Sequence, residues 1–145
     1  MRTRLLRSEH GAELIEMVIV TPLLLLLVFG IIDFGFLFQR YVVLTNAAVE
    51  GARVASLPGY TAGDATARVQ SYVTNALPPG VVANAAAVPT TVPGPAGTLW
   101  PAVQVTVTHL YTLQFVAPIM RLVGGPTAGT VTLTARSIMR RQVGT

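Results

Sequence analysis

Few side chains in this sequence could combine into a catalytic centre. After Arg40 the chain carries two acids, Glu50 and Asp64, and one histidine, His109. Catalysis by paired carboxylates needs two acids held at a set separation, and a serine nucleophile beside His109 and Asp64 would lack a supporting turn motif. Cysteine is absent. No residues stand at the spacing of a familiar metal site, and no phosphate-binding glycine loop is present. The sequence therefore predicts no enzyme, no catalytic residue, no cofactor and no metal site.

A long apolar segment near the N-terminus, and the charged residues in and before it, are the most informative feature of the sequence. Residues 17–38 contain one charged side chain, Asp33. As a helix these 22 residues span roughly 33 Å, enough to cross a bilayer core. Arg2, Arg4 and Arg7 precede the segment, so its N-terminal side should stay in the cytoplasm and the rest of the chain should be exported. A single-pass membrane protein is expected, with the transmembrane part at about 17–38.

A cleaved signal peptide is the alternative interpretation of this segment. Signal peptides have shorter apolar regions that end in a small-residue cleavage site. This segment is longer and continues into Gln39 and Arg40. A site near Ala47 and Ala48 stays open as an alternative.

Three polar positions in or beside the apolar segment need an explanation. Glu13 and Glu16 are three residues apart, so they share one helical face at the cytoplasmic edge. A buried carboxylate without a partner is costly, and a partner on another subunit would solve this for Glu16. Asp33 has either a functional role inside the membrane or a place in the outer headgroup region. Pro22 should kink or loosen the helix.

Helical character continues beyond the membrane, giving one helix over 13–57 that ends before Pro58 and Gly59. Small residues recur at four-residue spacing in its second half, which allows close approach of another backbone. That backbone belongs either to another subunit or to the chain's own domain. The residues are Ala47, Ala48, Gly51, Ala52 and Ala55.

The remaining residues, 58–145, should form an exported α+β domain. Residues 64–77 read as a second helix, 78–101 as an irregular linker, and 103–115 and 130–139 as alternating strands, with Leu110 as the one exception. His109 falls in the apolar register and is expected to be a core histidine. Two antiparallel strands need a cover, so we expect a long N-terminal helix packed on a small antiparallel sheet.

The C-terminal part is basic. The net charge is +4, and the last 81 residues hold five arginines and no acid. This pattern favours either an acidic partner or an ordinary solvated face. No dense basic stripe or binding motif supports nucleic-acid recognition, and no nucleic-acid partner is expected.

Several of these motifs together resemble known families. Gly11, four further residues and Glu16 before an apolar helix resemble the processing motif of type IV prepilins. The sequence VIVTPLLLLLVFGIIDFG at 18–35, AVEGAR at 48–53 and SIMR at 137–140 resemble TadE-like proteins more specifically. The resemblance is strong over 11–57 and weaker over 103–140.

The resemblance implies a pilin-like fold and a minor pilin or pseudopilin of a tight-adherence pilus or related secretion system. A prepilin peptidase would cut after Gly11, removing leader 1–11 and leaving Ala12 as the first and Glu16 as the fifth residue. Glu16, Pro22 and Asp33 would serve assembly, with other pilin or pseudopilin subunits and the assembly platform as partners in the bacterial inner membrane. Met17, where major pilins of this class have tyrosine, and the long exported domain favour a minor role. An uncleaved, membrane-anchored periplasmic scaffold is the alternative.

Overall fold

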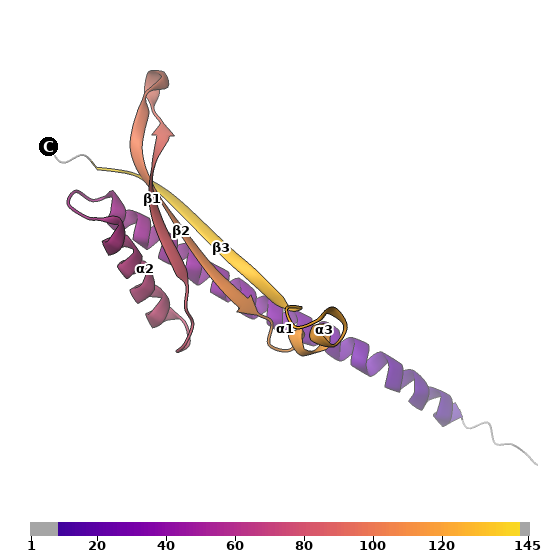
Figure 1. The fold of residues 1–145 in the computed structure, drawn as a ribbon. Coiled ribbons are helices and arrows are strands. Elements are labelled where there is room, and N and C mark those ends of the chain that lie inside the picture. Colours follow the sequence, from indigo (N-terminus) through magenta and orange to yellow (C-terminus); the bar gives the residue numbers. More distant parts are fainter. Residues whose placement is uncertain (1–8, 143–145) are drawn as a thin grey trace, which may run out of the picture.

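One helix runs through most of the molecule. The computed structural model describes residues 9–142, and its first element is α1, Glu9–Ser56, a helix of 48 residues. At 1.5 Å per residue it is roughly 72 Å long. Pro22 lies inside it without ending it. In Figure 1 its C-terminal part lies along a sheet, whereas its N-terminal part extends beyond every other element.

Two further helices flank the sheet. The helix α2, Ala62–Ala76, begins with a capping box: the Thr61 backbone N–H and side chain donate to the Asp64 carboxylate, and the Asp64 N–H donates to Thr61 Oγ1. These hydrogen bonds to the charged form lower the pKa of Asp64. The third helix, α3, Ala117–Gly124, connects two strands at the end of the sheet nearest the extended part of α1 (Figure 1).

The sheet has three antiparallel strands in the order β1-β2-β3. They are β1, Asn84–Pro93, β2, Leu99–Thr112, and β3, Thr130–Arg140, with a short 3-10 turn, Pro95–Gly97, between β1 and β2. Val105 of β2 pairs with Ala87 and Ser137, which fixes the register on both sides. The turn of the β1–β2 hairpin lies at the opposite end of the sheet from α3 (Figure 1).

The core lies between one face of the sheet and the helices α1 and α2. The inward side chains of β2, at every second position, are Val103, Val105, Val107, His109 and Tyr111, and all of them except the half-buried His109 are buried. They pack on Leu44 and the small residues of α1 and on Val69 and Val73 of α2. The observed fold confirms the expected α+β, pilin-like architecture with a long N-terminal helix on a small antiparallel sheet.

The segment expected to be an irregular linker, 78–101, differs from that expectation. It contains β1 and the start of β2, so the sheet has three strands where the alternation indicated two. The strand β1 was not predicted because its sequence, NAAAVPTTVP, is rich in alanine and proline, which have low strand propensity. Proline is tolerated here because β1 is an edge strand, paired on one side with β2.

The small residues of α1 lie in the core of the chain's own domain. Ala47, Ala48, Ala52 and Ala55 are buried, and so is Gly51. A Cβ on Gly51 would lie 2.5 Å from Val69 Cγ2 and 3.3 Å from the Ala65 carbonyl oxygen. The close backbone is therefore α2, which crosses α1 where the side chains are smallest.

This crossing predicts the effect of adding one methyl group. Gly51→Ala should lower the thermal unfolding midpoint of the purified chain in detergent, because overpacking costs about 1–3 kcal/mol and exceeds the helix-propensity gain of about 1 kcal/mol. Gly35→Ala is the matched control, since a Cβ there meets nothing within 4 Å. An equal or higher midpoint for Gly51→Ala than for Gly35→Ala would contradict the close approach of α2.

Candidate membrane-anchoring and assembly site

The N-terminal part of α1 stands free of the domain. Every residue at 13–28 is exposed, and most of the side chains after Glu16 are apolar. We call residues 13–28 the free segment. Among the described residues, α1 is the one helix long and apolar enough to cross a membrane. Large apolar side chains exposed over this length would be strongly unfavourable in water, which supports a lipid environment.

The predicted processing and assembly residues lie at the start of this segment. Gly11 and Ala12 are within the first turn of α1, and the leader arginines Arg2, Arg4 and Arg7 lie outside the described residues. Glu13 and Glu16 share one face of the helix with Met17, Val20, Thr21 and Leu24. In the described part of the chain, no ion pair or hydrogen bond involves the Glu16 carboxylate. Pro22 lies on the free segment as well, two turns before the domain begins.

Asp33 lies one turn after the first contact between α1 and the domain. Its side chain is 1% exposed, although it stands in the apolar segment. One carboxylate oxygen accepts from the Gln114 N–H at 2.8 Å. The other accepts from the Phe115 and Val116 N–H groups at 3.0 and 2.8 Å. Three backbone donors that precede α3 are thus satisfied by one carboxylate from α1.

Neighbouring contacts extend this attachment along the same face of α1. One turn before Asp33, Phe29 stacks on Phe115 with ring centroids 5.3 Å apart and an interplanar angle of 11°. Two turns after Asp33, the Arg40 guanidinium lies 5.4 Å from the centre of the Tyr111 ring. Burial raises the pKa of Tyr111, the Asp33 charge raises it further, and Arg40 lowers it. This face therefore joins the middle of α1 to the end of β2 and the loop after it.

Comparison with known proteins agrees with the features of this helix. The family model described as TadE-like protein matches residues 11–53. We call the matched residues, 11–53, the TadE-like segment. This match confirms the resemblance to TadE-like proteins seen in the sequence. Comparisons with curated proteins and with solved structures gave no match.

The TadE-like segment brings the predicted site residues into two separate groups. Gly11, Ala12, Glu16 and Pro22 lie on the free part of α1, away from the domain. Asp33 and the five small residues lie on the part that the domain covers. The partners of Asp33 could not be predicted from the sequence, because backbone N–H groups carry no side-chain signature. Phe29 and Phe115 were also missed, since each is an ordinary apolar residue in its own segment.

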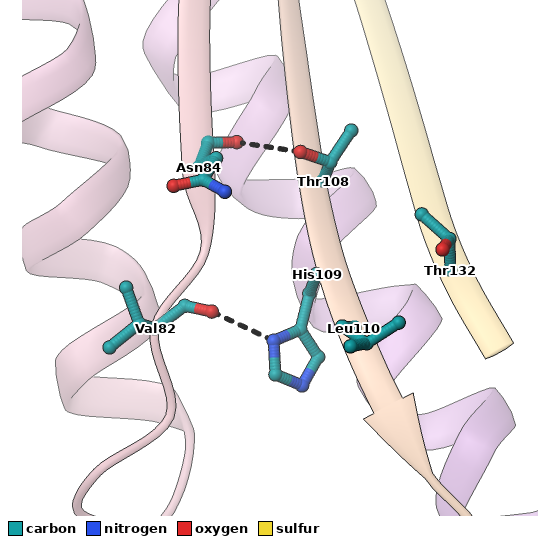
Figure 2. Close-up of a pocket in the computed structure, with 6 residues that line it drawn as sticks. All are labelled: Val82, Asn84, Thr108, His109, Leu110 and Thr132. Carbon is teal, nitrogen blue, oxygen red and sulfur yellow. Dashed lines mark hydrogen bonds between the residues drawn. The ribbon is translucent and has the colours of Figure 1, made fainter. Parts of the chain in front are cut away.

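The α+β domain that follows the free segment offers little that could perform chemistry. His109 lies in the inward register of β2, half-buried, and its Nδ1 donates to the Val82 carbonyl oxygen at 2.8 Å (Figure 2). The shallow hollow around it is lined by Val82, Asn84, Thr108, His109, Leu110 and Thr132, with no carboxylate. Among the described residues, no cluster of His, Asp and Glu could hold a metal ion. The histidine contact is structural, because it closes the chain before β1 onto β2.

The buried carboxylate of the TadE-like segment predicts a local effect of substitution. Asp33→Ala removes the acceptor of three N–H groups, and charge-assisted hydrogen bonds contribute about 1.5–3 kcal/mol each. Amide hydrogen exchange at Gln114, Phe115 and Val116 should therefore accelerate by about a hundredfold or more. Phe34→Ala, which removes an exposed neighbour, is the control. Unchanged exchange at these three amides in Asp33→Ala would show that the attachment does not depend on the carboxylate.

Proposed function

We propose that this chain is a minor pilin or pseudopilin of a tight-adherence pilus or a related secretion system. In this proposal it is a structural subunit and not an enzyme. It is anchored in the bacterial inner membrane by the apolar part of α1 at about 17–38, with the N-terminus inside and the domain exported. The observation that carries the proposal is the TadE-like match over residues 11–53, which begins at Gly11 and includes Glu16. The free, apolar N-terminal part of α1 supports it.

Processing after Gly11 would change the charge at the membrane edge. It removes Arg2, Arg4, Arg7 and Glu9, so the formal balance changes from ten basic and six acidic residues to seven and five. It also creates a new α-amine at Ala12. The basic leader that sets orientation is then gone, and a positive charge stands four residues before Glu16.

The position of Glu16 supports a role for this amine in assembly. The Glu16 carboxylate is exposed at the start of the free segment and adjoins apolar residues on its own face of the helix. In lipid it needs a counter-charge. The α-amine at Ala12 of a neighbouring subunit would supply one, and both buried charges would be compensated only when subunits assemble. Pro22, on the same segment, would let the helix adjust locally as neighbouring helices pack.

The processing step predicts a defined N-terminus. In native membranes, intact-mass measurement and N-terminal sequencing should find Ala12 as the first residue when the prepilin peptidase is present. The leader should be retained in a strain that lacks the peptidase. Retention of residues 1–11 in both strains would overturn processing and favour a permanently anchored periplasmic scaffold of the same machinery.

The pairing of Glu16 with a neighbouring amine predicts a separation between insertion and assembly. Glu16→Ala should reach the membrane in normal amounts but enter pili poorly, because the amine of the neighbour loses its partner. Glu13→Ala is the matched control, one turn earlier on the same face. Membrane fractionation and immunoblotting of sheared pili measure the two steps, and normal incorporation of Glu16→Ala would refute the pairing.

A further inference from the structure

The helix α3 carries an apolar surface that the fold leaves uncovered. Leu122 and Val123 are 88% and 91% exposed, and Ile119 and Met120 are about half exposed. We call these four residues the α3 patch. Phe115, just before the helix, is also partly exposed, and Arg121 is the one charged residue at 115–125. So many large apolar side chains on one short helix mark a contact with something apolar.

The position of α3 along the length of α1 indicates whether α3 lies at the depth of the bilayer. The loop before α3 is held at Asp33 and Phe29, which follow Met17 by 16 and 12 residues. These separations correspond to roughly 24 and 18 Å along the helix. A bilayer core of about 30 Å that begins at Met17 reaches beyond both attachment points. Figure 1 shows α3 at the end of the domain that faces the free segment.

The hydrogen bonds of the loop also suit a lipid environment. Backbone groups in lipid must be satisfied internally, since no water is present to hydrogen-bond them. The N–H groups of Gln114, Phe115 and Val116 all donate to Asp33. At the other end of α3, the Gly125 N–H donates to the Arg121 carbonyl oxygen. The loop is thus closed at both ends by internal hydrogen bonds.

We propose that the α3 patch inserts into the outer leaflet of the membrane beside α1, as a second membrane contact of the exported domain. This rests on the proposed membrane span of α1, with which the patch is continuous. Arg121 would extend from the patch towards lipid phosphates, as basic residues of interfacial helices do. The absence of acids after Asp64 removes a source of repulsion from anionic headgroups.

The absence of cysteine from the chain permits a direct test with single labels. Full-length Leu122→Cys, Leu24→Cys and Leu99→Cys variants, each carrying an environment-sensitive fluorophore, are reconstituted into phosphatidylcholine–phosphatidylglycerol vesicles. All three leucines are exposed. Leu99 begins β2 next to the hairpin turn, and Figure 1 shows this turn at the end of the sheet opposite α3. The Leu122 and Leu24 labels should emit at shorter wavelength, be quenched by lipid-attached nitroxides and be shielded from iodide. The Leu99 label should show the reverse.

The pattern of labels separates the possible failures. Iodide access at Leu122 with a shielded Leu24 would overturn the α3 contact alone. Iodide access at both positions would overturn the spanning helix and the α3 contact together. A Leu122 label shielded from iodide but not quenched by lipid nitroxides would mean that protein, such as a second copy of the chain, covers the patch, and would also overturn lipid insertion.

Discussion

The carboxylate of Asp33 attaches the folded domain to α1, close to the point where the fully exposed apolar part of the helix ends. Residues 13–28 of α1 are exposed on every side, whereas from Phe29 onwards one face is covered by the loop before α3, by the sheet and by α2. A charge at this position would be unfavourable without partners, yet three backbone N–H groups compensate it. Those N–H groups would in turn lack acceptors without the carboxylate. The domain is therefore held to α1 at a fixed level, and the stacking of Phe29 on Phe115 reinforces this attachment.

The opposite end of the covered helix is held in a different way. Around Gly51 the helices α1 and α2 approach closely, and the Arg68–Glu50 ion pair at 2.9 Å joins them at the surface. At the end of α1, the Ser56 carbonyl oxygen accepts from the Gln142 N–H, which fixes the chain after β3. Polar contacts thus lie at both ends of the covered part, and close apolar packing lies between them. The small side chains of α1 serve this packing within the domain.

The sequence predicted those elements whose signal lies in side-chain period or in helix-ending residues. The long helix, the second helix and the alternation of 103–115 and 130–139 were all recognisable, and even Leu110 lies outward as the alternation requires. The edge strand β1 was not recognisable in the sequence, because Ala and Pro have weak strand propensity and the strand forms through its pairing with β2. The hydrogen-bond partners of Asp33 could not be predicted from the sequence either, since they are backbone groups about 80 residues further along the chain. The family match could be anticipated from the order of Gly11, Glu16, Pro22 and the IIDFG sequence.

The continuity of α1 has a mechanical consequence. After Pro22, no turn or break separates the apolar part of the helix from the part that carries the sheet, so the helix after Pro22 cannot bend independently of the domain as domains joined by a linker would. Any change in the tilt of the apolar part after Pro22 would therefore change the tilt of the domain by the same angle. Between Asp33 and Ser56 the arm is roughly 35 Å, so a change in tilt of about 10° moves its far end by about 6 Å. A rearrangement of helices inside the bilayer would in this way be transmitted to the β1–β2 hairpin as a displacement outside it.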